Sequence, residues 1–268
     1  MRQEGEKIFV ENSINVAFDN EVTEKDFHIL ENPNVIRSVP VQNRQQFYEE
    51  LEEVVKKHTR YLNEIKLMPS SNKSKYYLFT KRCMDLTAGI AGSTLLLPFL
   101  PIAAIAIKLD SRGPVLYTQK RVGKDGRLFN IYKFRTMIEG AESKTGEVWA
   151  TENDPRLTLV GRFLRKTKID ELPQFINLIK GDMSMVGPRP ERPCFVEEFS
   201  KYIPGYRRRL DVIPGITGIA QLRNGYDKDA PKLIRKLRFD ITYVKKMNLL
   251  LDLKLIAKTV IMSVRGKL

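Results

Sequence analysis

The feature that most constrains this chain is an apolar run without a charged residue, LTAGIAGSTLLLPFLPIAAIAI. Its 22 residues, 86–107, reach the length that a helix needs to cross a bilayer. Pro98 and Pro101 fall past its middle, where a continuous helix would lose backbone hydrogen bonds and bend. As helices, the part before Pro98 spans only ~18 Å and the part after it only ~14 Å. Neither half therefore crosses a hydrocarbon core of about 30 Å.

Basic residues flank this run on both sides: Lys75, Lys81 and Arg82 before it, and Lys108, Arg112, Lys120 and Arg121 after it. Positive charge on both sides indicates that both ends are cytoplasmic. A helix, a break and a second helix that returns to the same face would satisfy both observations, because the freed carbonyls would stay near protein or headgroups. A straight membrane-spanning helix and a buried core helix are the alternatives.

This run divides the chain into three parts. We expect a soluble extension over residues 1–75, a re-entrant membrane segment over 76–109 and a catalytic domain over 110–268. Residues 1–75 carry 11 Lys and Arg against 13 Asp and Glu, whereas residues 76–268 carry 35 against 19. The positive field of the later part favours phosphates, in nucleic acid, nucleotides or lipid headgroups. The first residues are polar, so we expect no secretory signal.

The scarcity of Cys and His limits the possible chemistry. Cys83 and Cys194 are the only cysteines, which excludes a disulfide framework or a zinc-ligand pattern and fits a reducing compartment. Both histidines, His28 and His58, precede residue 76. A general base in the later part must therefore be a carboxylate, Lys, Tyr or Cys, and a triad built on histidine is excluded there.

The periodicity predicts an α+β fold that is mainly helical. Residues 115–122 and 127–134 have strand-like composition and are joined by GKDG, which predicts a β-hairpin. Helical spacing marks residues 47–68, 171–180, 191–209, 230–247 and 249–265. The last of these is amphipathic and basic, which suits an interfacial helix on anionic lipid or ordinary core packing equally well. No motif in residues 1–75 carries recognisable chemistry, so we expect an accessory or interaction segment there.

Two adjacent carboxylates, Asp170 and Glu171, lie in KIDELPQFINLIKGD behind the basic run RFLRKTK. The stretch is typical of a helix start, with Asp170 as the N-cap, Glu171 in the first turn and Pro173 where no hydrogen bond is lost. A helix N-terminus and the nearby basic residues would keep Asp170 ionised at the surface. Such a carboxylate is a poor general acid but suits a metal ligand or a nucleophile. From the residues alone, capping and function both stay open.

Three turn-rich stretches accompany the pair. GDMSMVGPRPE (181–191) could offer backbone N–H groups and a guanidinium to a phosphate. PGITGIAQL (214–222) is a second loop of this kind, and ENDPRLTLVGRF (152–163) places Asp154 and Arg156 just upstream. Each is weak alone, since turn residues are usually only turns.

In combination, these segments resemble the monotopic phosphoglycosyl transferases, the bacterial sugar transferase family. The resemblance covers about residues 76–268 and rests on KRCMD (81–85) with the apolar run, GPVLYTQKRVG (113–123), FNIYKFRTM (129–137), the long motif over 153–191, PGITGIAQL, and the late segment 239–260. The family's Ser-Pro pair at the helix break corresponds to Leu97-Pro98, so the serine is missing. The resemblance is to the small form, here with an N-terminal extension and no preceding four-helix bundle.

The resemblance implies a reaction. Sugar 1-phosphate would move from a UDP-sugar to polyprenol (undecaprenyl) phosphate with release of UMP, as the first membrane step of exopolysaccharide, capsule, O-antigen or glycoprotein-glycan synthesis. Asp170 would attack the β-phosphate in a ping-pong mechanism, and Glu171 would bind the required Mg²⁺. The substrate-binding candidates are Lys133, Arg135, Arg165, Arg189 and Gln221.

The resemblance also implies a location and partners. The protein would be monotopic on the cytoplasmic face of the bacterial inner membrane and would contact its lipid. We expect no nucleic acid, a homo-oligomer as one option, and a protein partner for the N-terminal segment as another. A nucleic-acid-binding module would leave the apolar run unexplained. A catalytically silent scaffold is disfavoured by the intact Asp170–Glu171 pair.

Overall fold

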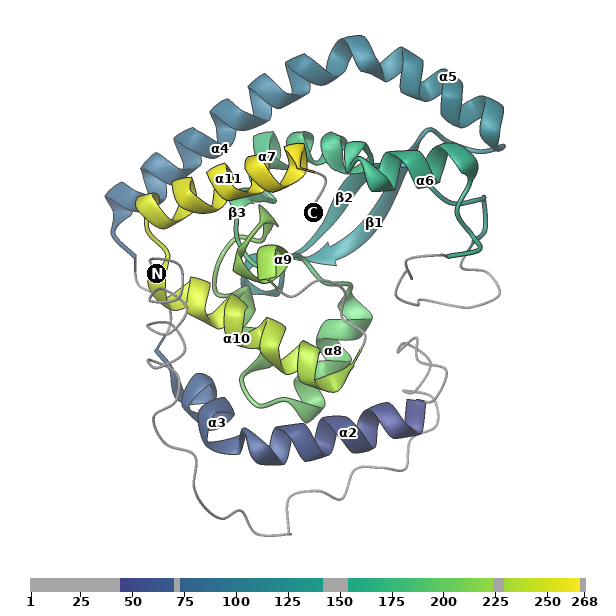
Figure 1. Ribbon diagram of the computed structural model, residues 1–268. Helices are drawn as coiled ribbons and strands as arrows, with labels where there is room; N and C mark the ends of the chain where they lie inside the picture. Colours follow the sequence, from purple (N-terminus) through teal and green to yellow (C-terminus); the bar gives the residue numbers. More distant parts are fainter. Residues whose placement is uncertain (1–43, 70–72, 142–153, 224–228, 266–268) are drawn as a thin grey trace, which may run out of the picture.

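The computed structural model describes residues 44–69, 73–141, 154–223 and 229–265 (Figure 1). The rest of the predicted extension, residues 1–43 and 70–72, lies outside them. The α-helices are α2 (Arg44–Lys57), α3 (Thr59–Leu67), α4 (Lys75–Leu96), α5 (Leu100–Asp110), α6 (Leu159–Lys166), α7 (Phe175–Lys180), α8 (Pro193–Tyr202), α9 (Ile219–Arg223), α10 (Ala230–Lys246) and α11 (Leu249–Val264). Strands β1 (Leu116–Val122) and β2 (Leu128–Phe134) form one sheet, and β3 (Ser184–Val186) and β4 (Gly215–Thr217) another. The described residues are thus mainly helical with small sheets, as predicted.

The apolar run forms a helix that breaks where expected. α4 ends at Leu96, a 3₁₀ turn covers Leu97–Phe99, and α5 follows. Figure 1 shows the two helices meeting at an angle above the rest of the molecule. The apolar side chains are largely exposed, with Leu95 71% and Ile102 67% accessible. This exposure contradicts the buried core helix, and the segment Lys75–Asp110 is long and apolar enough to enter a membrane.

The KRCMD motif attaches α4 to the rest of the protein. Lys81 Nζ lies 2.8 Å from Asp252 Oδ2 on α11, and both side chains are buried. Arg82 donates to the last carbonyls of α7, at Leu178 and Ile179, where a cation also complements the helix dipole. Asp85 accepts from the Met185 amide of β3 at 2.8 Å. The motif is therefore a set of anchors that fixes the apolar helix on the rest of the protein.

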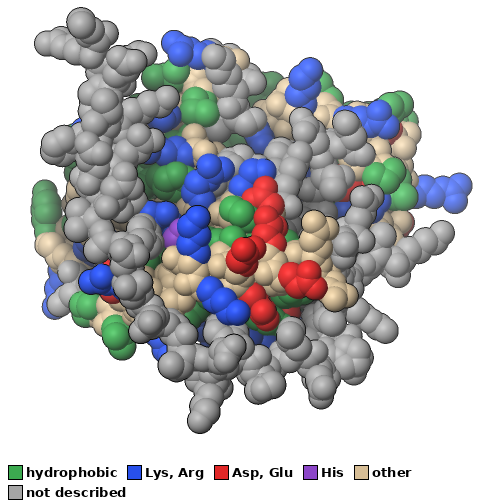
Figure 2. Space-filling view, turned by 60° about the horizontal axis from the view of Figure 1, so that its bottom comes forward, with side chains coloured by type: hydrophobic (Ala, Val, Ile, Leu, Met, Phe, Trp, Pro, Cys, Tyr) green, Lys and Arg blue, Asp and Glu red, His purple; other side chains and the backbone are tan. Residues whose placement is uncertain are grey.

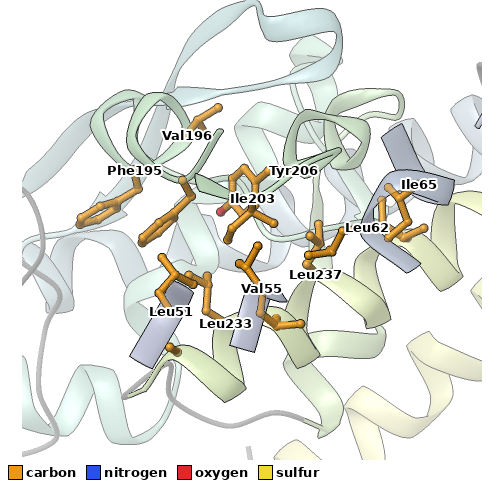
Figure 3. Close-up of a cluster of buried hydrophobic side chains, with 14 of the residues drawn as sticks. Leu51, Val55, Leu62, Ile65, Phe195, Val196, Ile203, Tyr206, Leu233 and Leu237 are labelled. Atoms are coloured by element: carbon orange, nitrogen blue, oxygen red, sulfur yellow. The ribbon is translucent and has the colours of Figure 1, made fainter. Parts of the chain in front are cut away.

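The predicted helix over 47–68 is two helices. α2 and α3 meet at His58, and their apolar sides pack against α8, α10 and the 3₁₀ segment Tyr206–Leu210 in one cluster (Figure 3). Its members include Phe47, Leu51, Val55, Leu62, Ile65, Phe195, Phe199, Ile203, Tyr206, Leu233 and Leu237. This part of the extension is therefore integral to the core.

The outer face of α2 is acidic. Figure 2 shows acidic side chains gathered on the face of the molecule where α2 lies, and this helix carries Glu49, Glu50, Glu52 and Glu53.

This packing predicts a stability effect. Leu62→Ala should lower the free energy of unfolding by about 2–5 kcal/mol, because the side chain is fully buried and its removal leaves a cavity. Leu67→Ala on the same helix is the matched control, since Leu67 is 81% exposed and its loss should cost under about 0.5 kcal/mol. Chemical denaturation of both variants measures the difference. Equal, small effects would show that α3 does not contribute to the core.

The β-hairpin is confirmed. β1 and β2 pair antiparallel from Leu116↔Phe134 to Val122↔Leu128. Asp125 and Gly126 adopt the left-handed conformation at the turn, which Gly and Asp tolerate better than most residues. The predicted helix over 191–209 is wrong in detail. It is interrupted after Tyr202, where Pro204 cannot continue the ladder and Gly205 turns with φ 75°.

Two stretches interpreted from sequence as separate loops pair with each other. β3 and β4 are parallel, with Ser184 opposite Gly215 and Val186 opposite Thr217. The backbones come so close that a Cβ at Gly215 would lie 2.0 Å from the Gly187 nitrogen. The segments GDMSMVGPRPE and PGITGIAQL therefore form one compact unit.

Candidate active site

Asp170 and Glu171 lie at the start of a 3₁₀ segment, Ile169–Gln174, which continues into α7. Lys168 holds the cap position with φ 60°, and no side chain caps the segment. The prediction that Asp170 is the N-cap is therefore wrong. The cap position is two residues earlier, at Lys168, so Asp170 lies inside the first turn of the segment. Its side chain is only 5% exposed.

Glu171 is held by two cations. Its Oε1 lies 2.7 Å from Lys133 Nζ on β2 and 2.6 Å from Arg189 Nη2 in the 187–191 loop. Burial alone would raise the pKa of Glu171, but the charges of Arg189 and Lys133 outweigh it and hold that pKa well below its usual value. Reciprocally, Glu171 raises the pKa of Arg189. Glu171 is therefore ionised at neutral pH.

Asp170 has the opposite environment. Burial is the largest influence and raises its pKa, Lys133 lowers it, and the negative charge of Glu171 raises it further. Its Oδ1 is buried without a hydrogen-bond partner among the described residues. The expectation that Asp170 sits at the surface and is stabilised as an anion is wrong, because the cations contact Glu171 instead. A carboxylate with a raised pKa and an unpartnered oxygen is more basic, and hence more nucleophilic, than a solvated one.

One cavity of about 530 Å³ contains the pair and most of the predicted binding residues. Its wall includes Lys133, Arg135, Arg165, Arg189, Asp170 and Glu171. Arg165 reaches it from α6 and donates from Nε to Thr136 Oγ1 at 3.0 Å. The cavity is thus a concave, strongly cationic site with two carboxylates, which suits a substrate with several phosphate oxygens.

Arg135 connects this site to the membrane segment. Its Nη2 donates to the carbonyls of Ile107 and Ser111 at the end of α5, at 3.3 and 2.6 Å. Its Nε and Nη1 are buried and have no partner among the described residues. Arg135 therefore lines the cavity and also ties the last turn of the apolar helix to the sheet.

Gln221 is not brought to the cavity. It lies on α9, where its Nε2 reaches the Gly187 carbonyl at 3.5 Å, and it does not line the cavity wall. Asp154 and Arg156 from the upstream motif form a bidentate pair, and Arg156 borders the cavity. The glycine-rich segment with Gln221 therefore supports the 187–191 loop.

Sequence reasoning missed how that loop is fixed. Four successive carbonyls each accept a hydrogen bond: Pro188 from the Gly215 amide, Arg189 from Arg209, Pro190 from Arg121, and Glu191 from the Val122 amide, at 2.9, 2.9, 3.1 and 2.9 Å. Arg209 is in turn paired with Asp240 of α10 at 2.7 Å. The two prolines beside Arg189 indicate a stiff loop, but no local pattern points to Arg209 or Arg121. Arg189 is therefore presented to Glu171 from a preorganised backbone.

Asp170 and Glu171 are the residues of this cavity that could hold a magnesium ion together with a substrate. Mg²⁺ commonly takes one or two carboxylates and completes its shell with water and substrate phosphates. Asp170 and Glu171 are such hard oxygen donors, and no larger cluster of His, Cys, Asp or Glu occurs in the part of the chain that the structure describes. Glu171, with Asp170 beside it, would hold the ion.

The comparisons with known proteins identify a family for this chain. The bacterial sugar transferase family model matches residues 76–266. The chain is 43% identical over 83% of its length to a UDP-N-acetylgalactosamine-undecaprenyl-phosphate N-acetylgalactosaminephosphotransferase of Aeromonas hydrophila, of which the match covers 52%. It is 41% identical over 67% of its length to a UDP-glucose:undecaprenyl-phosphate glucose-1-phosphate transferase of Caulobacter vibrioides, of which the match covers 68%.

A UDP-glucose:undecaprenyl-phosphate glucose-1-phosphate transferase of Escherichia coli is also 41% identical over 67% of this chain, but the match covers only 39% of the E. coli protein. The chain thus spans about half the length of several of its curated relatives. The matched residues include the apolar helix, the hairpin, the carboxylate pair and the arginine loop. The chain therefore belongs to the bacterial sugar transferase family, whose members here are named as undecaprenyl-phosphate sugar phosphotransferases.

Proposed function

We propose that the protein transfers sugar 1-phosphate from a UDP-sugar to undecaprenyl phosphate through a covalent intermediate on Asp170. The observation that carries the proposal is the difference between the environments of the two adjacent carboxylates. Glu171 is neutralised by two cations, whereas Asp170 keeps a buried oxygen without a partner inside the same cavity. A carboxylate prepared in this way, beside guanidinium groups, suits attack on phosphorus.

The reaction would proceed in two displacements. An Asp170 oxygen attacks the β-phosphorus of the donor, the bond from that phosphorus to the bridging oxygen breaks, and UMP leaves with that oxygen. An oxygen of undecaprenyl phosphate then attacks the phosphorus of the adduct, which releases the Asp170 carboxylate and gives the undecaprenyl-diphosphate-sugar. Arg189 and Lys133 orient the phosphate oxygens, and Arg189 is held for this role by its loop. When bound, Mg²⁺ would supply charge neutralisation at the diphosphate.

Release of UMP tests the proposal. Purified protein in detergent is given undecaprenyl phosphate, Mg²⁺ and one member of a panel of UDP-sugars. At least one donor should release UMP with formation of lipid-linked sugar. Absence of UMP release across the panel would contradict the proposed donor class.

Glu171→Gln tests the metal role. The change keeps the shape but removes the charge, so it should raise the Mg²⁺ concentration needed for half-maximal activity by at least about tenfold, since one charged ligand is lost. Asp182→Asn, on the turn after α7, is the control and should leave the metal response unchanged. An unaltered Mg²⁺ titration in Glu171→Gln would remove this residue from the metal site.

We also propose that the apolar segment is re-entrant and that the protein lies on the cytoplasmic face of the inner membrane. The break at Leu97–Phe99 supports this, as do the exposed apolar side chains of α5 and of its neighbour α6, where Leu159 and Phe163 face outwards. Apolar side chains of α11 are exposed as well.

Cysteine labelling tests the topology. In a background where Cys83 and Cys194 are Ser, cysteines placed at Lys75 and Arg112 bracket the segment. A membrane-impermeant reagent should reach both sites from the cytoplasmic side only. Labelling from opposite sides would show a spanning helix.

A further inference from the structure

One wall of the cavity carries side chains to which the proposed mechanism gives no role. Tyr117, Gln119 and Arg121 alternate along β1 and all line the cavity, as residues two apart on a strand share a face. Tyr117 pairs with Lys133 and Gln119 pairs with Ile131. Gln119 therefore lies two residues further along the sheet than Lys133, about 7 Å at the usual rise per residue, and Lys133 contacts Glu171.

The amide of Gln119 is held in one orientation. Its Oε1 accepts from Arg121 Nη2 at 2.6 Å, and Arg121 Nη1 donates to the Pro190 carbonyl at 3.1 Å. A guanidinium has donors only, so it must face the amide oxygen and never the amide nitrogen. Burial also lowers the pKa of Arg121 to about 10, which leaves it charged at neutral pH. Gln119 Nε2 is consequently turned away from Arg121. It donates no hydrogen bond to any of the described residues.

We propose that Gln119, oriented by Arg121, reads the nucleobase of the donor and selects uracil over cytosine. The inference rests on the proposed function, in which the donor is a UDP-sugar. A fixed amide offers one N–H donor beside one oxygen acceptor. The imide edge of uracil offers the complement, a carbonyl oxygen beside N3–H, whereas cytosine places an amino group and a bare nitrogen there. Cytosine would thus set donor against donor and acceptor against acceptor.

The neighbouring groups fit a nucleotide that has its diphosphate at the carboxylate pair and its base at Gln119. Lys133 and Arg189 bind at the carboxylate pair, where the diphosphate reacts, and the 189–191 loop runs from there to Arg121. Tyr117, 40% exposed, offers a ring face on which a base can stack. Sugar hydroxyls both donate and accept, so they would gain little from an amide fixed in one orientation.

Binding of free nucleotides tests this directly. Calorimetric titration of the full chain in detergent should show UMP binding at least about tenfold more tightly than CMP, the discrimination expected of one good bidentate contact to a base. In Gln119→Ala, and in the volume-matched Gln119→Met, the two nucleotides should bind within about twofold of each other. Gln45→Ala on the exposed face of α2 is the control and should keep the full preference. Thermal denaturation confirms that each variant is folded.

The outcomes separate the two proposals. A UMP preference that survives in both Gln119 variants would overturn the base assignment and leave the transferase proposal standing. The base assignment would also be overturned if the Gln119 variants bound a UDP-sugar more weakly than the wild type but bound UMP equally well. In that case Gln119 would contact the sugar and not the base. Wild-type protein that binds neither nucleotide would contradict the uridine donor itself.

Discussion

Asp170→Asn should reduce sugar-1-phosphate transfer by roughly 10³-fold or more, on the scale seen when a catalytic nucleophile is removed. The amide has nearly the shape of the carboxylate but cannot form the acyl phosphate. The cavity, Glu171 and its two cations would remain, so donor binding should change much less than turnover.

The same substitution should leave stability unchanged or raise it. Burial raises the pKa of Asp170, so its ionised form costs folding free energy at neutral pH, and a neutral amide avoids that cost. Loss of activity together with an equal or higher Tm is the expected pair of results. Asp182→Asn serves as the control for both measurements. Near-normal turnover by Asp170→Asn would show that Asp170 is not the nucleophile.

Asp252→Leu should destabilise the protein by about 3–5 kcal/mol, because it leaves the ammonium of Lys81 buried without its counter-charge. Asp252 is fully buried and also accepts from the hydroxyls of Tyr77 and Tyr243, both at 2.8 Å. The loss would loosen α4 from α11, and thereby the attachment of the apolar helix to the domain.

A second substitution makes this prediction specific. Lys81→Met combined with Asp252→Leu replaces the buried pair by apolar groups and should recover most of the lost stability. Lys254→Met, on the exposed side of α11, should change it by under about 0.5 kcal/mol. Denaturation curves of the single, double and control variants measure the coupling. A cost below about 1 kcal/mol for Asp252→Leu alone would contradict the anchoring role.

Local patterns predicted the elements that are determined locally. The hairpin follows from strand-like residues around GKDG, and α10 and α11 follow from helical periodicity. The break after Leu96 follows from Pro98, since no proline can donate to the ladder. These features depend on residues within one or two turns of each other.

The rest depends on contacts between distant residues. β3 and β4 pair across about 30 residues, and Lys81 meets Asp252 across 171 positions, so neither leaves a periodic pattern. The charge environment of the pair was mispredicted for the same reason. The basic residues near Asp170 in sequence were expected to keep it ionised at the surface. Burial instead raises its pKa more than Lys133 and Arg165 lower it, and the cations from β2 and the loop, Lys133 and Arg189, bind Glu171.

The most direct test of the account is the mass of the intact protein after mixing with a UDP-sugar and Mg²⁺ in the absence of undecaprenyl phosphate. We expect UMP release without acceptor and a mass increase equal to one sugar-phosphoryl group, which is a sugar phosphate less one water, mapped to the peptide that contains Asp170. The adduct should disappear when undecaprenyl phosphate is added, and it should never form on Asp170→Asn. UMP release that requires the lipid acceptor, with no adduct on the wild-type protein, would contradict the covalent mechanism.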